Sequence, residues 1–482
     1  MNSTENSSSA RSILERSEIY SLLNLPELCR PGVNDLVGAY RNGALSPVDV
    51  TKAHLARAEE VDTALNAFSL IDHDGAVQAA RASEERWRRG RPVGPLDGVP
   101  VTIKDAVTTQ GWPSRYGSRT TDASPQRSDS PSVRLLRRSG AVLLGQTAIP
   151  EFGWKALTDG PLYGITRNPW NPELTPGGSS GGAAVAAATG AGVLHLGTDG
   201  GGSIRVPASF TGVVGHKPTF GRVPAYPPSP FGTVSHIGPL ARRVADASLM
   251  LDVLSGKDPR DWHQNPLAFA AREALPAFSF AGARVGVWTT PPAGVVAADV
   301  SAEFHRAVRL IEQRGATVEP VTPPLDGALE LFHLLWFAGA ARVLSGVRAS
   351  DQSGMDLGLI AIADAGRRFS AADYVDAGIR RAEFGAAMEN LFGSFDLLIS
   401  PTTAVTPFAV GADVPRGSGL NHWTEWASFS FPLNLSQQPA CSIPCGRSSQ
   451  GLPIGLQIIG PRGADWRVLG AAAACEQLFA AI

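Results

Sequence analysis

Short hydrophobic runs alternate with longer amphipathic segments along most of the chain. The runs have the length of β-strands and lie at 100–104, 141–144, 193–196, 283–287, 318–321, 396–400, 441–444 and 454–459. The longer segments place apolar residues at helical spacing and lie at 34–42, 47–61, 75–89, 132–138, 182–189, 241–254, 299–314, 328–344, 371–391 and 465–480. The repeated order of strand, helix and strand predicts an α/β layered architecture.

The chain is long enough for a large core and contains no stretch at which it must divide. Of its 482 residues 43% are hydrophobic, and no linker-like run occurs between Asn34 and the C-terminus. Residues 1–17 are rich in serine and asparagine, so we expect a disordered tail there and one domain over 18–482. The formal net charge of -2 gives no reason to expect a nucleic acid or a membrane as a partner.

The sequence carries no signal for secretion, membrane insertion or metal binding. The polar residues 1–10 lack the basic and apolar regions of a secretory signal, and the Ala/Gly-rich run 181–197 is too short and broken to span a membrane. The four cysteines form no C-x-x-C pair, and the nine histidines show no metal-binding spacing. We therefore expect a cytoplasmic protein with free thiols.

Two glycine-rich clusters lie between Thr175 and Pro218, and each of them contains serine. The first is GGSSGG at 177–182, and the second is GGGS at 200–203. The expected helix 182–189 and strand 193–196 lie between them, so both clusters fall at turns that could face one another across a pocket. Glycine runs allow several backbone N–H groups to approach one developing negative charge, as an oxyanion hole requires.

Lys104 is the candidate base, since it ends an apolar β-branched run in a chain that is poor in lysine. Burial at the end of such a strand disfavours the charged ammonium and lowers the pKa of a lysine. A neutral lysine can accept a proton from a serine hydroxyl.

These segments together resemble the amidase signature family of serine hydrolases. The matching pieces are DGVPVTIKD, GAVLLGQTAIPEFG, YGITRNPWNPELTPGGSSGG, GTDGGGSIRVPASFTGVVGHKPTFGRVP and GLPIGLQIIG, and the similarity runs from about residue 34 to 477. The resemblance implies one α/β/α layered domain around a large mixed, mostly parallel β-sheet. It also implies that the loop at 108–130 frames the mouth of the pocket.

The resemblance further implies a catalytic triad in which Ser203 is the nucleophile, Ser179 the relay and Lys104 the base. It implies a cis peptide bond before Ser179. The backbone N–H groups of Gly200, Gly201, Gly202 and Ser203 are the candidates for the oxyanion hole. Ser180 and Asp199 are expected to support the triad, and Arg205 to fix the loop after Ser203. Such a site needs neither a metal nor another cofactor.

The implied reaction is hydrolysis of an amide, with carbamates and esters chemically within reach. Trp154, Trp426 and Phe429 are candidate substrate-binding residues, and an apolar wall favours a hydrophobic or aryl amide. The alternative function within this family is that of the glutamine-hydrolysing subunit of the tRNA-dependent amidotransferase. That branch usually carries an acidic residue and then Phe/Tyr-Thr where this chain has the stretch 427–430, ASFS. The expected partners are a small amide and water, and a homodimer stays open.

Three other interpretations are weaker. The pattern G-x-S-x-G occurs at 177–181 and 178–182, but a nucleophile elbow follows a strand, and the preceding NPWNPELTP contains three prolines. A phosphate-binding loop lacks the Lys-Ser/Thr that would follow its glycines. A catalytically inactive binding protein on the same fold is disfavoured, because competent residues fill all three triad positions.

Overall fold

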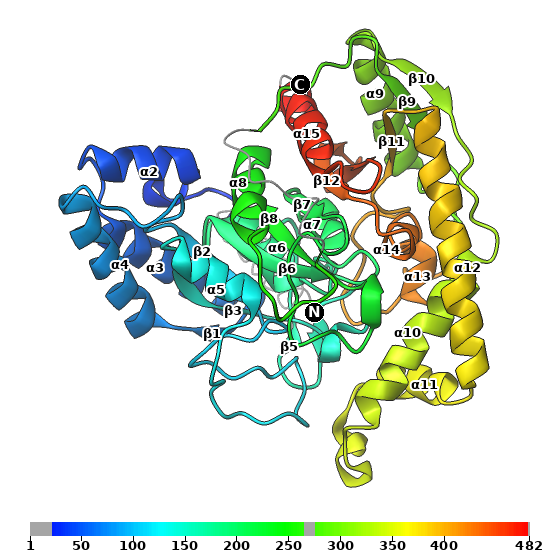
Figure 1. Cartoon of the computed structure of the whole chain (residues 1–482), viewed down its shortest axis with the longest axis horizontal. Helices are drawn as coiled ribbons and strands as arrows, with labels where there is room; N and C mark the ends of the chain where they lie inside the picture. The colour runs from blue at the N-terminus through cyan, green and yellow to red at the C-terminus, as the bar shows by residue number, and fades with distance from the viewer. Residues whose placement is uncertain (1–21, 265–274, 481–482) are drawn as a thin grey trace, which may run out of the picture.

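The computed structural model describes residues 22–264 and 275–480, and the predicted tail at 1–17 lies outside the described residues. Its centre is an eleven-stranded sheet with the strand order β1-β3-β2-β6-β8-β7-β12-β13-β11-β9-β10 (Figure 1). These strands are β1 (Phe68–Ile71), β2 (Pro100–Lys104), β3 (Val142–Thr147), β6 (Leu194–Asp199), β7 (Val214–Lys217), β8 (His236–Ala241), β9 (Arg284–Val287), β10 (Thr317–Pro320), β11 (Leu397–Pro401), β12 (Ala440–Arg447) and β13 (Pro453–Ile459). β4 (Asp159–Gly160) and β5 (Gly164–Ile165) form a separate pair.

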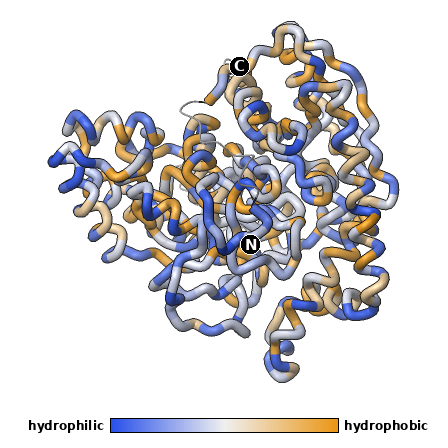
Figure 2. Tube along the Cα trace, viewed as in Figure 1, coloured by the Kyte–Doolittle hydropathy of each residue, from blue (hydrophilic) through white to orange (hydrophobic). Residues whose placement is uncertain are grey.

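Helices cover both faces of the sheet, and the α/β layered architecture is confirmed. The longer ones are α2 (Val33–Arg41), α3 (Pro47–Leu65), α4 (His73–Arg88), α5 (Pro131–Arg138), α6 (Gly181–Thr189), α7 (Arg205–Thr211), α8 (Val244–Leu254), α9 (Ala298–Gln313), α10 (Ala328–Leu344), α11 (Leu357–Gly366), α12 (Ala371–Asn390) and α15 (Asp465–Ala480). Among the short helical turns are α13 (Trp423–Trp426), α14 (Pro432–Leu435) and η2 (Glu151–Gly153). Hydrophilic and hydrophobic positions mix along the outer helices α2–α4 (Figure 2).

Strand β3 illustrates how both faces are buried. Leu143 belongs to the core that includes α5, α8 and α15, whereas its neighbours Val142 and Leu144 pack with α3 and α4 on the other face. Neighbouring side chains of a strand point to opposite faces, so a strand buried on both sides reads as a continuous apolar run. This is the pattern that marks the predicted strands in the sequence.

The large mixed sheet is confirmed, but parallel pairing is less extensive than expected. β3, β2 and β6 pair in parallel, as do β11, β9 and β10. The other six of the ten pairings between neighbouring strands are antiparallel. The reason is that β12 and β13 form a hairpin and that β7 and β8, which the sequence did not predict, fill the centre of the sheet.

The bounds of several helices match the predicted ranges, except where a strand takes the first residues of a predicted helix. The bounds of α10 and α15 coincide with the predicted 328–344 and 465–480. The helix expected at 241–254 begins later, at Val244, because Ala241 ends β8. Among the described residues, no helix combines the length and the hydropathy needed to cross a membrane.

Candidate active site

Lys104 is the last residue of β2, and the alternation of the strand sends it to the face that α6 covers. Val101 and Ile103 belong to the core on the opposite face. Lys104 is fully buried, and its Nζ lies 2.8 Å from Ser179 Oγ, 2.9 Å from Ser180 Oγ and 2.8 Å from Thr198 Oγ1. The structure therefore brings the predicted base and the first serine cluster into direct contact.

The environment of Lys104 favours the neutral amine. Burial lowers its pKa from 10.5 to about 7, and only the charge of Asp199 acts in the opposite direction. Its three closest partners are hydroxyl groups, which can donate to a neutral amine as well as accept from an ammonium. A lysine in this state can take up a proton near neutral pH.

Ser179 lies in a tightly packed turn that leads into α6. The peptide bond between Gly178 and Ser179 is cis, as the resemblance implies. A Cβ atom on Gly178 would lie 2.1 Å from the carbonyl oxygen of Leu157, so only glycine fits this position. The backbone N–H of Ser180 donates to the carbonyl of Ser203 over 3.1 Å, and this bond ties the two serine loops together.

Ser203 follows the end of β6 and precedes α7. The strand ends at Asp199, and the carboxylate of Asp199 accepts from the backbone N–H of Gly202 at 2.7 Å and of Ile204 at 3.2 Å. Asp199 thereby holds the loop on both sides of Ser203.

A buried network of hydrogen bonds holds the carboxylate of Asp199 in place. Arg205 donates to both carboxylate oxygens of Asp199 at 2.9 Å and also binds Gln457 Oε1 and Asn434 Oδ1, each at 2.7 Å. Burial alone would raise the pKa of Asp199, but the charge and hydrogen bonds of Arg205 hold it well below its usual range. Asn434 and Gln457 were not predicted, because they lie more than 200 residues away from Asp199 in the sequence. Asn434 belongs to none of the matching motif pieces, and the piece GLPIGLQIIG that contains Gln457 does not indicate which residue it contacts.

The predicted set of oxyanion donors needs one correction. The N–H of Gly202 is already bound to Asp199, so it is not available to a ligand. In the part of the chain that the structure describes, the N–H groups of Gly200, Gly201 and Ser203 have no acceptor within the protein. These three N–H groups remain the candidates.

Ser179 and Ser203 line one cavity that is open to solvent and has a volume of about 1550 Å³. Its walls are mainly apolar, and no carboxylate lines them. The lining residues are Ala106, Tyr116, Phe152, Gly153, Ser179, Thr198, Gly200, Ser203, Ala225, Pro227, Pro228, Ser229, Pro230, Phe231, Ser235, Ile237, Trp336, Arg342 and Val343. Tyr116 comes from the loop at 108–130 that was expected to frame the mouth.

Trp336 of α10 forms the wall nearest the glycine loop. A Cβ atom on Gly200 would lie 2.7 Å from its indole ring. The ring stacks on Phe231 with a centroid distance of 3.9 Å, and its Nε1 donates to the carbonyl of Trp154 at 2.9 Å. Trp336 is thus a rigid aromatic surface directly beside the candidate oxyanion donors.

The three predicted substrate-binding residues do not line this cavity. Trp154, Trp426 and Phe429 belong to the hydrophobic core beneath it. Trp426 stacks on Phe210 at 5.7 Å, and Phe429 packs against Trp288 at 5.0 Å. Large aromatic residues serve cores and binding walls equally well, so their type alone could not distinguish the two roles.

The histidines near the serine clusters take no part in the contacts of Lys104. His195 Nδ1 lies 2.8 Å from Thr102 Oγ1, and His216 Nε2 lies 3.3 Å from Asp465 Oδ1. Within residues 22–264 and 275–480, no three His, Cys, Asp or Glu side chains form a group that could hold a metal.

Known proteins match this chain over nearly its whole length. The family model described as Amidase matches residues 49–469. A glutamyl-tRNA(Gln) amidotransferase subunit from Streptomyces coelicolor is 36% identical over 477 residues, with 92% of this chain and 95% of that protein covered. A bacterial aryl acylamidase structure of the amidase signature family superposes with a TM-score of 0.86 at 30% identity, covering 93% of this chain and 96% of its own. The 6-aminohexanoate cyclic dimer hydrolase superposes with a TM-score of 0.85 at 27% identity, covering 94% and 98%.

Proposed function

The chain belongs to the amidase signature family, and from this membership and the geometry of its site we propose that it hydrolyses an amide C–N bond through an acyl-enzyme on Ser203. The observation that carries the proposal is the buried contact of Lys104 with Ser179, because Ser179 and Ser203 line the same cavity. We assign Ser203 as the nucleophile, Ser179 as the relay and Lys104 as the base.

The proposed reaction moves one proton along this triad. Ser203 attacks the carbonyl carbon while its proton passes to Ser179, and Ser179 gives its own proton to neutral Lys104. We assign the stabilisation of the oxyanion to the N–H groups of Gly200, Gly201 and Ser203, which have no acceptor among the described residues. The proton then returns to the leaving nitrogen as the C–N bond breaks, and water hydrolyses the acyl-enzyme by the same route.

The first candidate substrate is a small amide with an apolar or aryl group. The cavity supports it, because aromatic and aliphatic side chains form most of the walls and Arg342 is the one charged residue that lines them. The α-ammonium group of a free amino acid would find no carboxylate there. Aryl carbamates and esters present the same carbonyl to Ser203 and fit the same walls.

The second candidate is the side-chain amide of glutamine, with the chain acting as the glutamine-hydrolysing component of an amidotransferase. The names of the sequence relatives favour it, since the Streptomyces coelicolor protein at 36% identity is named as a subunit of such an enzyme. A chain with this function would work together with other subunits. The walls of the cavity argue for the first candidate and the sequence relatives for the second.

A substrate panel separates the two candidates. We expect kcat/KM for acetanilide or benzamide to exceed that for glutamine by at least about tenfold, because a buried apolar wall discriminates against a zwitterion. The measurement is the release of aniline, ammonia or glutamate from acetanilide, benzamide, ethyl N-phenylcarbamate and glutamine, with Ser203→Ala as the blank. Turnover of glutamine without turnover of the aryl substrates would establish the second candidate.

Trp336 is expected to set the preference for bulky groups. Trp336→Ala should lower kcat/KM for benzamide by about 10- to 100-fold and for acetamide by less than about threefold, because only the larger substrate reaches the indole. Phe337→Ala is the matched control, since Phe337 is the next residue of α10 and does not line the cavity. Equal losses on both amides would show that Trp336 only supports the glycine loop.

We propose a cytoplasmic location for this chain. All four cysteines are free and buried, which is typical of proteins in a reducing compartment and supports a cytoplasmic location.

A further inference from the structure

The catalytic cavity contains one charged group that the proposed triad does not use, the guanidinium of Arg342. Arg342 lies near the end of α10 and is the one charged residue among those that line this cavity. The other lining side chains are mainly apolar or carry neutral hydroxyl groups. A cation is therefore present on the wall of the proposed substrate site, and no group of opposite charge lines the same wall.

Arg342 has no carboxylate partner within the protein. Its Nη1 donates to Ser345 Oγ over 3.4 Å, which is a long hydrogen bond, and no ion pair joins it to an Asp or Glu of residues 22–264 or 275–480. By contrast, the nearby Arg348 is paired with Asp351 at 2.8 Å. The guanidinium of Arg342 is thus available to an anionic group of a ligand.

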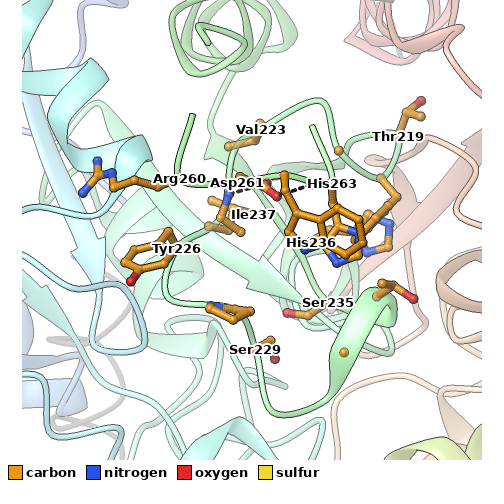
Figure 3. Close-up of a pocket in the computed structure, with 17 residues that line it drawn as sticks. Thr219, Val223, Tyr226, Ser229, Ser235, His236, Ile237, Arg260, Asp261 and His263 are labelled. Carbon is orange, nitrogen blue, oxygen red and sulfur yellow. Dashed lines mark hydrogen bonds between the residues drawn. The ribbon is translucent and has the colours of Figure 1, made fainter. Parts of the chain in front are cut away.

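The adjoining cavity also has an arginine on its wall, but that arginine is paired. This cavity shares a wall with the catalytic one (Figure 3), made by Ala225, Pro228, Ser229, Ser235 and Ile237. Its Arg260 is held by Asp258 at 2.7 Å and lies over the ring of Tyr226. Of the two arginines that line these cavities, Arg342 is therefore the one that a ligand carboxylate can use.

The spacing of residues on α10 indicates how long such a ligand is. Trp336 lies beside Gly200, whose N–H is a proposed oxyanion donor, since a Cβ atom on Gly200 would lie 2.7 Å from the indole. Arg342 follows Trp336 by six residues on the same helix. At a rise of about 1.5 Å per residue, the two positions are about 9 Å apart along the helix axis. An aryl ring between the scissile carbonyl and the carboxylate spans a comparable length.

We infer that the amide hydrolysed at this site carries a carboxylate at the far end of an apolar body, and that Arg342 binds this carboxylate. The inference rests on the proposed function and narrows its substrate class. The apolar body would pack on the stacked rings of Trp336 and Phe231, and the guanidinium would pair with the carboxylate through parallel N–H···O bonds. Free glutamine fits this class poorly, because its α-ammonium lies beside its carboxylate and the guanidinium repels it.

Binding to the Ser203→Ala variant tests the inference without turnover. Two pairs of ligands differ only by a carboxylate, which lies on the amine side in 4-acetamidobenzoate and acetanilide and on the acyl side in 4-carbamoylbenzoate and benzamide. In at least one pair the carboxylate should tighten binding at low salt by about three- to tenfold. Because Arg342 is exposed, this gain should fall below about twofold at about 1 M NaCl. Absence of a gain in both pairs overturns the inference.

Substitution of Arg342 in the same variant tests the residue. Arg342→Gln should reduce the gain to less than about twofold, and Arg342→Lys should retain part of it, because the charge remains. Arg348→Gln is the matched control, since it removes the same charge from an exposed residue that does not line the cavity, and it should keep the full gain. A gain that survives Arg342→Gln, or that Arg348→Gln removes as well, overturns the inference.

The proposed function fails by a different result. In the protein with Ser203 intact, Arg342→Gln should lower kcat/KM for the carboxylated amide relative to its neutral partner by the same three- to tenfold, as about expected from the loss of one exposed ion pair. If none of the four amides is hydrolysed, the proposed function is wrong. The binding comparison still decides whether Arg342 recognises a carboxylate.

Discussion

Replacing Ser203 by alanine is expected to lower kcat by about 10⁴- to 10⁶-fold while the protein remains folded. Ser203 is the proposed nucleophile, and no other hydroxyl lies both in the catalytic cavity and on the loop that Asp199 fixes. Ser203 lines the cavity, and backbone hydrogen bonds to Asp199 hold its loop, so the loss of its hydroxyl should leave the thermal unfolding temperature nearly unchanged. The measurement is kcat on the best substrate of the panel, with thermal unfolding as the check of folding.

Ser180→Ala is the matched control for this experiment. Ser180 also contacts Lys104, at 2.9 Å, but it does not line the cavity. Lys104 keeps its contacts with Ser179 and Thr198 in this variant, so measurable activity should remain. A fluorophosphonate probe should label Ser203. Labelling of Ser179 or Ser180 instead would contradict the assignment and favour a nucleophile elbow.

Lys104→Ala is expected to lower kcat/KM by several orders of magnitude, and Lys104→Arg by nearly as much. A guanidinium stays protonated at any pH at which the protein is folded, so it cannot accept a proton. The arginine variant is the sharper test, because it retains a positive charge and a long side chain. Near-normal activity of Lys104→Arg would rule out Lys104 as the base.

The pH profile gives the same assignment a second test. Lys104 accepts a proton only when neutral, so kcat/KM should rise about tenfold per pH unit below its pKa of about 7 and level off above it. The profile is measured from pH 5 to about 10 with a neutral substrate. His195→Gln should leave the position of this rise unchanged, because His195 bonds to Thr102 and does not contact the triad. A shift of the rise in this variant would indicate a histidine base.

The sequence predicts the parts of the fold that depend on short-range pattern. The apolar run that ends at Lys104, the helix over 328–344 and the serine clusters all lie where the pattern puts them. α7 escaped prediction because Pro207 interrupts its pattern, although a proline in the first turn of a helix loses no hydrogen bond. β7 and β8 escaped because glycine, proline and histidine break their apolar runs.

The walls of the cavity depend on contacts that are distant in the sequence. Trp336 lies beside Gly200 only because the fold brings α10 to the glycine loop after β6, and nothing in its local sequence separates it from Trp154. Gly202 likewise looks identical to Gly200 and Gly201 in the sequence. Only the fold shows that Asp199 occupies its N–H. Motifs thus locate the proposed reacting groups, whereas substrate preference requires the tertiary structure.

The buried state of Lys104 links proton uptake to unfolding. An unfolded lysine has a pKa of about 10.5, compared with about 7 in the native protein, so unfolding between these pH values takes up a proton. The unfolded state binds more protons in this window, and the contribution of Lys104 to the free energy of unfolding therefore rises with pH from about 7 to 10.5. Alkaline conditions leave the amine of Lys104 neutral, as its proposed role as a base requires. Under the same conditions the burial of Lys104 destabilises the native state least.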